Sequence, residues 1–489
     1  MSGASVARPV SWTTPVREAV VQGWDTLWGI TLFLISTVFR VLSTHSKSIS
    51  RGVLFFLIAG TAAFTRDFSK LRIGPLYITE ICMALLLVNV GTLLAHKKAA
   101  LLPANRLARQ TVYMVIAYIM YGALRFGIDL ASSAFGDLLP SLRNFAIVYY
   151  ASFSVLGWVV IQGPDSRAVI RNILTAIALV STIASLWTVI KYMSGLPLWV
   201  DDTEFDVTKV IAGHAVVFAM LSLLVELNVL WLYKTASAGR RFISVIVLLL
   251  NILYIYLSGH RSALIACGIG IITMILSVKF QLRDHLHSKV RWRWVICALL
   301  IAVVGSYILS SHLQEFTLKY RTMLDPLAEI NAAWRAAYWL NVFTLWRSAP
   351  ITGVGFSHDF YDEEPFHVYR FEHYDPHNSY LALLARTGVC GLLLVLVTVF
   401  VFSRLMIQVL RHAGSYQIVF LASCLLSCFV TVGTFASFNV TLESPYHAIF
   451  FWLIVGMGIA LAGSNAATNT AVPPEFTAQD KGSNAYPTG

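Results

Sequence analysis

Residues 379–402 read SYLALLARTGVCGLLLVLVTVFVF, a run that is long and apolar enough to cross a lipid bilayer as a helix. Further runs of this kind follow one another along the chain, separated mostly by short polar stretches. They cover residues 52–66, 75–95, 111–127, 143–162, 169–190, 210–233, 242–258, 261–279, 294–312, 415–435 and 446–464. The sequence therefore predicts an all-α polytopic membrane protein with about twelve transmembrane helices.

The composition agrees with lipid as the solvent. The 489 residues are 57% hydrophobic and 12% charged, whereas a soluble domain is about 25% charged. The net charge of +11 is typical of a membrane protein with basic cytoplasmic loops, so we expect membrane lipids and no nucleic acid as partners. All six cysteines lie in apolar runs without a CxxC pair, which predicts neither a disulfide framework nor a zinc site.

The short loops alternate in charge, and this alternation fixes the orientation. The basic set contains Lys97, Lys98, Arg106, Arg109, Arg167, Arg171, Lys234, Arg240, Arg241, Lys279, Arg283, Lys289, Arg291, Arg293, Arg404 and Arg411. The loops between them are acidic or nearly neutral. Because Lys and Arg are retained in the cytoplasm, the basic loops and both termini are predicted to lie inside, as in a multi-pass protein of the bacterial inner membrane.

Four regions follow from this orientation. Residues 1–51 form a cytoplasmic N-terminus, in which residues 24–42 are interpreted as an interfacial helix, although a further span stays open. Residues 52–209 form an N-terminal transmembrane half, and residues 210–464 a second region that includes a long external loop at 313–378. Residues 465–489 are rich in Ala, Asn, Thr, Pro and Gly and are predicted to be a disordered cytoplasmic tail.

The loop at 313–378 is far longer than the other connections, and loops of this length are commonly functional. Residues 331–348 carry apolar side chains at helical spacing, which predicts a helix on the membrane surface. Pro350 then ends this helix, and Gly353 and Gly355 favour a turn.

Ionisable side chains gather at the external ends of the predicted spans and in this loop. They are Arg125, Arg143, His214, His260, Arg261, Glu443, Arg321, Arg335, His358, His367, His373, Asp375 and His377. The positive-inside rule disfavours cations on this face, so their presence predicts an anionic ligand, and the planar guanidinium suits phosphate. The alternative is that these arginines snorkel or form structural ion pairs.

The most specific local pattern is Pro376-His377-Asn378-Ser379, followed by Gly388 and Gly391. His377-Asn378, nine residues, Gly388, two residues and Gly391 resemble the H-[NSQ]-x9-G-x-x-G signature of the O-antigen ligase and polysaccharide polymerase superfamily. The two glycines are interpreted as clearing one helix face for close packing.

Two further segments resemble this superfamily. Residues 258–264, SGHRSAL, begin a span on the external side, where the superfamily has an Arg-Ser motif, although Ile265 stands where a stricter motif asks for Leu. Arg335 and Trp339, upstream of Pro350-Ile351-Thr352-Gly353-Val354-Gly355, resemble the superfamily's loop helix and its P-x-x-G-x-G turn. Together the resemblances cover about residues 210–464.

The resemblance implies a GT-C-like membrane glycosyltransferase that is inverting, metal-independent and free of cofactors. Its donor would be a glycan on undecaprenyl diphosphate, and its acceptor a hydroxyl of lipid A–core or of a lipid-linked glycan on the periplasmic face. It further implies His377 as the base and Arg261 and Arg335 as diphosphate ligands. Residues in a supporting role would be Arg143, His260, Arg321, Asn378 and Glu443.

The residue chemistry is consistent with that implication. An imidazole near neutral pKa can take a proton from a sugar hydroxyl, and two arginines can neutralise a leaving diphosphate. His373 and His377 flank Asp375, but this spacing matches no metal-ligand motif, so no metal is expected.

Three alternatives stay open. Ligase and polymerase need the same donor site and base, so the sequence favours ligase only narrowly. A polysaccharide flippase or transporter is less favoured, because no internal repeat is evident and the ionisable residues lie at one face. A structural subunit without activity is the third.

Overall fold

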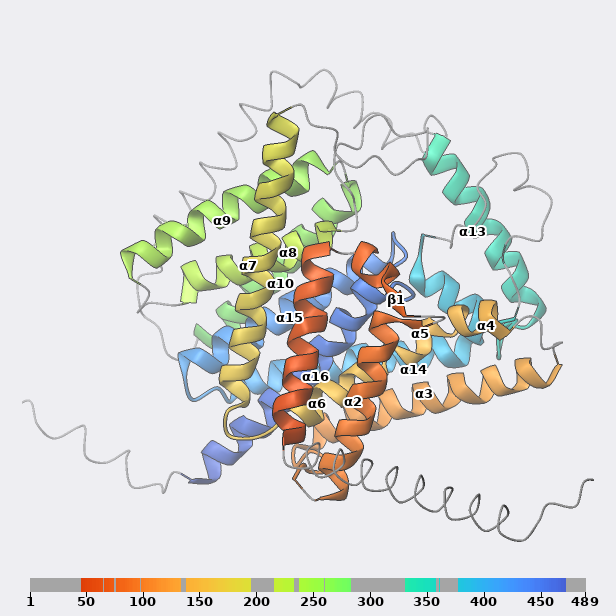
Figure 1. The fold of residues 1–489 in the computed structure, drawn as a ribbon, viewed down its shortest axis with the longest axis horizontal. Coiled ribbons are helices and arrows are strands. Elements are labelled where there is room, and N and C mark those ends of the chain that lie inside the picture. The colour runs from red at the N-terminus through yellow and green to blue at the C-terminus, as the bar shows by residue number, and fades with distance from the viewer. Residues whose placement is uncertain are drawn as a thin grey trace, which may run out of the picture.

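The computed structural model describes residues 45–64, 66–73, 76–96, 98–132, 138–194, 215–232, 237–258, 260–282, 330–357, 360 and 377–471. These residues form a helical bundle (Figure 1). Its described strands are β1 (Arg72–Ile73) and β2 (Leu76–Tyr77), which pair antiparallel with Arg72 opposite Tyr77. The predicted interfacial helix at 24–42 and the span at 294–312 lie outside the described residues.

Nine helices in the described part of the chain are long and apolar enough to cross a membrane. They are His45–Phe64, α2 (Ile78–Ala95), α3 (Arg106–Ser132), α7 (Ser166–Met193), α9 (Ala238–Leu257), α10 (Arg261–Leu282), α14 (Ser379–Arg411), α15 (Tyr416–Ala436) and α16 (Pro445–Ala471). The protein is therefore a helical polytopic membrane protein, as the sequence predicts.

The remaining predicted spans are less regular. The run at 143–162 is divided among α4 (Leu138–Asn144), α5 (Ala146–Tyr149) and α6 (Ser152–Ile161), and its two arms are bent by 44°, which gives a tenth candidate span. The run at 210–233 appears as α8 (Val216–Leu232), a shorter apolar helix. The described residues thus support nine or ten candidate spans, and the count of twelve stays a prediction. α16 continues to Ala471, beyond the predicted span end at 464.

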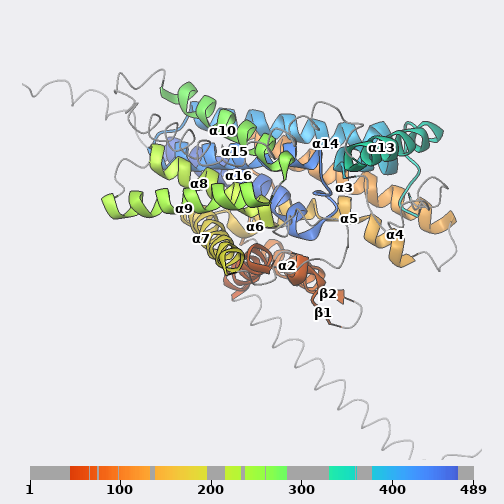
Figure 2. The same cartoon turned by 90° about the horizontal axis from the view of Figure 1, so that it is seen from above.

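Helices α15 and α16 form the centre of the bundle. In their apolar stretches 83% and 89% of the residues are buried, against 28–39% in the other candidate spans. α15 packs against α8, α10, α14 and α16, and α16 packs against α6. In Figure 2, α15 and α16 lie between α10 and α14 on one side and α6 and α7 on the other. The outer helices expose large apolar side chains such as Met120, Leu124 and Phe400, as expected for surfaces that face lipid.

One end of the bundle is fastened by basic residues that the sequence places in the cytoplasm. Arg51 donates to both carboxylate oxygens of Asp165, at 2.5 and 2.9 Å, and Lys47 Nζ donates to the carbonyl of Gln162. The Arg51 guanidinium holds the pKa of Asp165 below its usual range. Arg167 donates to the carbonyl of Ser464, which attaches the last third of α16 to the start of α7.

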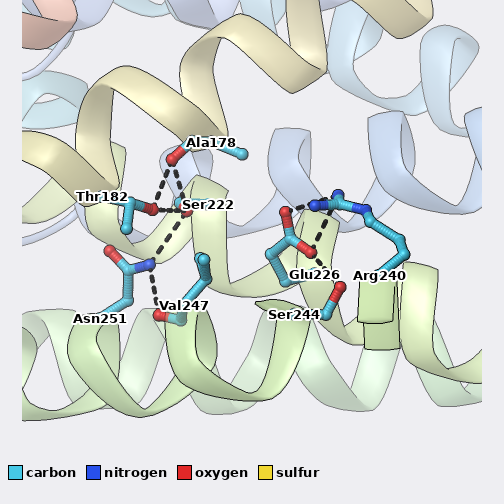
Figure 3. A network of polar contacts seen from close by, with 8 residues as sticks. All are labelled: Ala178, Thr182, Ser222, Glu226, Arg240, Ser244, Val247 and Asn251. Atoms are coloured by element: carbon cyan, nitrogen blue, oxygen red, sulfur yellow. Dashed lines mark hydrogen bonds and ion pairs between the residues drawn. The ribbon is translucent and has the colours of Figure 1, made fainter. Parts of the chain in front are cut away.

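Two buried polar clusters join α7, α8 and α9 (Figure 3). In the first, Asn251 Nδ2 donates to Ser222 Oγ at 3.0 Å and to the Val247 carbonyl at 2.8 Å, and Ser222 also contacts Thr182 and the Ala178 carbonyl. In the second, Arg240 and Ser244 both donate to the buried carboxylate of Glu226. Each polar group in these clusters has a partner, which a helix interface inside lipid requires.

Candidate functional site

His377 and Asn378 lead directly into α14. Asn378 is the N-cap residue, and its Oδ1 accepts from the backbone N–H groups of Tyr380 and Leu381 at 3.1 Å each. His377 has a φ of 45° and is the one non-glycine residue with positive φ in the described part of the chain. This left-handed conformation is sterically costly for a residue with a Cβ, so its surroundings must hold it.

Ser379, the first residue of α14, is fully buried, and its hydrogen bonds help to hold the nearby His377 backbone in place. Its hydroxyl accepts from the N–H groups of Thr441 and Leu442 at 2.8 and 3.0 Å. It donates to Glu443 Oε2 at 2.5 Å, with the Asn439 carbonyl at 3.1 Å as a second acceptor. A hydroxyl has two lone pairs and one proton, so these contacts use all of its capacity and Ser379 is not available as a nucleophile.

Asn439 extends the same connection to the start of α10. Its Nδ2 donates to Ser262 Oγ at 2.9 Å and to the Phe435 carbonyl at 3.2 Å. Ser262 directly follows Arg261, and Ser379 follows His377 by two residues. The segment between α15 and α16 therefore brings the start of α10 and the start of α14 together. We call this end of the bundle, which the sequence predicts to be external, the outer end.

A break in α14 forms the second part of the outer end. At Gly388 the backbone leaves the helix, with a φ of 66° and a ψ of −171°. The predicted role of Gly388 in clearing a helix face is wrong, because this glycine supplies a backbone conformation that L residues rarely adopt. A Cβ at this position would also overlap the carbonyl of Ile351. Gly391 does lie in the helix, where a Cβ would overlap Thr387 and approach the ring of Tyr121 to 3.3 Å.

The turn at residues 350–355 fills this break with hydrogen bonds. Val389 and Cys390 donate to the carbonyls of Pro350 and Ile351 at 3.0 and 3.3 Å. In return, the carbonyls of Ala385 and Arg386 accept from Val354 and Gly355 at 2.8 and 3.0 Å. The Thr387 carbonyl accepts from the Tyr121 hydroxyl. The turn and the break thus form one unit, in which the backbone groups of each supply hydrogen-bond partners for the backbone groups of the other.

A buried ion pair on α3 holds the far side of this turn. Asp129 Oδ1 pairs with Arg125 Nη1 at 2.7 Å, and Asp129 Oδ2 accepts from the Phe356 N–H at 2.6 Å. Arg125 also donates to the Gly353 carbonyl, and Asn144 donates to the Phe356 carbonyl. The ring of Phe356 is fully buried and lies edge-on to Phe145.

The helix predicted within the long loop is confirmed as α13 (Ile330–Ser348), which carries Arg335. It packs against α14, and its end is joined to the turn by Trp346 Nε1, which donates to the Pro350 carbonyl at 3.0 Å. α13 thus leads directly into the turn that fills the α14 break.

The predicted site residues fall into three groups. His377, Asn378, Arg261, His260 and Glu443 lie on the segments that meet at the outer end, where His260 Nδ1 donates to the Ser258 carbonyl at 2.8 Å. Arg335 lies on α13, and Arg143 is an exposed residue of α4 beside the Asn144 that binds Phe356. Arg321, with His214, His358, His367, His373 and Asp375, lies outside the described residues.

Sequence reasoning missed several residues of the outer end. Asn439 carries no signal in the sequence beyond being polar, and Ser379 stands in the Pro376-His377-Asn378-Ser379 pattern, although the sequence assigns it no role. Asp129 is absent from the predicted site residues, although it lies within α3 at the end of the bundle that holds them and is 3% exposed. Arg386 interrupts an apolar run, which could have drawn attention to it. It is 2% exposed, and its guanidinium lies 4.2 Å from the centre of the Phe360 ring. Among the described residues no group of His, Cys, Asp and Glu is arranged to hold a metal ion.

Comparison with known proteins identifies a domain that contains several of these residues. Residues 246–396 match the O-antigen ligase family model, whereas no curated protein matches the chain. The match begins in α9, includes Arg261, Arg335, His377, Gly388 and Gly391, and ends in α14. The chain is thus a polytopic membrane protein with an O-antigen ligase domain, a domain of proteins that transfer lipid-linked glycans in polysaccharide biosynthesis. Asn439 and Glu443 lie outside the matched residues.

Proposed function

We propose that this protein is an inverting, metal-independent glycosyltransferase of the inner membrane, GT-C-like in fold. It moves a glycan from undecaprenyl diphosphate to an acceptor hydroxyl at the periplasmic face. The acceptor is lipid A–core, as in an O-antigen ligase. The observation that carries the proposal is the connection of Ser262 and Ser379 through Asn439, because it joins the segments that bear Arg261 and His377.

His377 is the proposed base. A sugar hydroxyl is a weak nucleophile, and its attack on the anomeric carbon becomes easier as an imidazole takes its proton. The strained backbone of His377 supports this role, since residues in costly conformations cluster at active sites. Inversion follows from one displacement, in which the acceptor oxygen bonds to the anomeric carbon as the bond to the diphosphate oxygen breaks.

Arg261 and Arg335 are the proposed ligands of the donor diphosphate. The leaving group carries the electron pair of the broken bond, and guanidinium groups stabilise that developing charge through paired hydrogen bonds. Arg261 begins α10 at the outer end, and Arg335 is carried by the helix that leads into the 350–355 turn. His260, Asn378 and Glu443 support this arrangement from neighbouring positions, and Arg143 and Arg321 are the further cations proposed to assist.

A polymerase is the second candidate, because it would use the same donor, the same base and a lipid-linked glycan as acceptor. A flippase is less favoured, since the predicted site residues that the structure describes lie at or near the ends of helices rather than along a path between the two faces.

The experiment is a transfer assay with the purified protein in lipid nanodiscs. The donor is an undecaprenyl diphosphate-linked glycan, and the acceptor is lipid A–core. We expect Arg261→Ala and His377→Ala each to abolish transfer, while Arg404→Ala, an exposed arginine at the opposite end of α14, transfers normally. Transfer should be unchanged by EDTA. Full activity of either site variant would refute the mechanism, and strong inhibition by EDTA would replace it with a metal-dependent one.

A further inference from the structure

The segment of residues 437–444 makes polar contacts to two predicted site segments at once. Asn439 contacts Ser262 through its side chain and Ser379 through its carbonyl. Thr441, Leu442 and Glu443 contact Ser379 as well. None of these contacts is made by a residue to which the mechanism above assigns the proton transfer or the binding of diphosphate.

The bonds at Ser379 are strong for a neutral side chain. The N–H groups of Thr441 and Leu442 occupy both lone pairs of the Ser379 hydroxyl, so the hydroxyl proton is left to donate to Glu443 or to the Asn439 carbonyl. The 2.5 Å distance to Glu443 Oε2 lies at the short end of the range for O–H···O hydrogen bonds. Because Ser379 is fully buried, water does not compete for these bonds. The start of α14 is therefore fixed to the connection between α15 and α16.

Asn439 in the same way holds the start of α10 against the end of α15. Its amide has two protons, and the acceptors of both are Ser262 Oγ and the Phe435 carbonyl. The Phe435 bond fixes the amide on α15, so the Ser262 bond sets the position of α10 relative to α15. Arg261 and His377 are each within two residues of a side chain bound by the 437–444 segment.

We propose that Asn439 and Ser379 are positioning residues that set the spacing between Arg261 and His377 during glycan transfer. The inference rests on the proposed function and adds to it residues that touch neither the donor nor the acceptor. A displacement of about 1 Å between reacting groups can lower a rate by about 10²-fold. The spacing set by these two side chains therefore affects kcat more than the binding of the donor.

The chain provides a matched control for Asn439. Asn251 makes the same two bonds, one to a serine hydroxyl and one to the carbonyl four residues earlier, within the α7–α8–α9 cluster (Figure 3). Asn439→Ala and Asn251→Ala remove the same atoms and these two kinds of hydrogen bond, and Asn251→Ala also removes the bond that Ser185 Oγ donates to Asn251 Oδ1. Asn251→Ala is therefore at least as disruptive a change, but only Asn439 is bonded to the segments that carry Arg261 and His377.

The experiment measures kcat and the donor KM in the nanodisc assay, normalised to folded protein. For Asn439→Ala we expect kcat to fall by about 10²-fold, with a donor KM within about threefold of the parent value. Asn251→Ala should keep the parent kcat even if its thermal stability falls. Ser262→Ala is the milder variant, in case Asn439→Ala does not fold, and should lower kcat in the same direction. Ser379→Ala should lower kcat as well, and Ser379→Thr, which keeps the hydroxyl, should restore part of it.

Double substitution completes the test. If Asn439 acts through Ser262, the Asn439→Ala/Ser262→Ala variant should be no slower than Asn439→Ala alone, because the second change removes a bond that is already lost. A parent kcat in Asn439→Ala, or equal losses in Asn439→Ala and Asn251→Ala, would overturn the proposal. His377→Ala separates this failure from that of the proposed function. An inactive His377→Ala beside a fully active Asn439→Ala would refute only the positioning role.

Discussion

His377 combines a strained backbone with the side chain that we assign to proton transfer. A left-handed conformation costs an L residue about 1–2 kcal/mol. His377 keeps this conformation immediately before α14, whose first residue, Ser379, is hydrogen-bonded to Thr441, Leu442 and Glu443. Since the flanking bonds belong to Asn378 and Ser379, the backbone strain and the imidazole chemistry can be separated by substitution.

Replacement of His377 by glycine makes this separation. Glycine adopts positive φ without cost, so His377→Gly should unfold at the same temperature as the parent or a higher one. Without the imidazole, kcat should fall by about 10²–10⁴-fold, the usual contribution of a general base. Thermal unfolding and the nanodisc assay measure the two effects on the same preparation. His377→Asn, which also tolerates positive φ, is the control for side-chain volume, and an active His377→Gly would refute the role of base.

At the scale of single residues, the sequence predicts the groups to which we assign the chemistry, but it does not predict the side chains that hold their segments in place. His377 and Arg261 stand in patterns of fixed local spacing. Asn439 and Ser262 are 177 positions apart, and although Ser262 stands in the Arg-Ser motif, nothing in the sequence marks Asn439 as its partner. Their pairing depends on how α10, α14 and α15 pack, which local spacing does not encode.

Within the elements, the break in α14 requires new hydrogen-bond partners for its backbone N–H and C=O groups, because a backbone group without a partner near lipid is costly. Backbone groups of the 350–355 turn meet most of that requirement, and the Tyr121 hydroxyl donates to the Thr387 carbonyl. The P-x-x-G-x-G turn and the first glycine of the histidine signature are therefore two halves of one structure. Each needs positive φ, at Gly353 and Gly355 in the turn and at Gly388 in the helix.

Substitution of Gly388 by alanine tests this joint structure. The new Cβ would meet the Ile351 carbonyl at a backbone conformation that alanine adopts only with strain, so we expect a loss of about 1–3 kcal/mol of stability and loss of transfer. Gly268→Ala is the control, since its Cβ would meet nothing within 4 Å and alanine favours helix. Melting temperatures in detergent compare the two, and equal values would contradict this account of the break.

The Arg125–Asp129 pair gives a second prediction at this scale. Asp129→Ala leaves a largely buried guanidinium without its carboxylate, which typically costs about 3–5 kcal/mol. The double variant Arg125→Ala/Asp129→Ala should melt higher than Asp129→Ala alone, because Arg125 is then no longer present without its carboxylate. Additive losses in a double-mutant cycle would show that the pair is not coupled.

Glu226 provides the matched comparison for activity. Glu226→Ala also breaks a buried ion pair, with Arg240, but it lies in the cluster between α8 and α9 rather than at the turn. Below the melting temperature of both variants, Glu226→Ala should transfer glycan at the parent rate. Asp129→Ala should transfer glycan more slowly than the parent. Asp129 holds the 350–355 turn in place, and that turn follows the end of α13 and bonds to the break in α14.

The sequence predicts the positions of α13 and α14, but it does not predict the break inside α14. The run at 379–402 predicts one span, and α14 covers it, but the apolar pattern does not show that the backbone leaves the helix at Gly388. A glycine in an apolar run is compatible with close packing and with a break. The hydrogen bonds that decide between them come from residues 350–355, which are distant in sequence.

Over the whole molecule, the two ends of the bundle differ in chemistry. Lys47, Arg51 and Arg167 make ion pairs and backbone bonds that join neighbouring helices at the end predicted to be cytoplasmic. The opposite end holds Arg261, His377 and the break in α14. Composition and the alternation of loop charge predicted this division because both follow from the bilayer. The acceptor does not follow from either, since ligase and polymerase share the donor chemistry.

Deletion of the encoding gene distinguishes the two acceptors in the intact cell. For a ligase we expect full-length polymer to accumulate on undecaprenyl diphosphate, because polymer continues to form and only its transfer to lipid A–core is lost. For a polymerase, lipid A–core would instead carry single repeat units. Electrophoresis of lipopolysaccharide, with mass spectrometry of the lipid-linked pool, measures both species. Complementation with Arg261→Ala should reproduce the deletion, whereas Arg404→Ala should restore the parent pattern. A deletion strain whose lipid-linked units stay on the cytoplasmic face would favour a flippase and contradict glycan transfer by this chain.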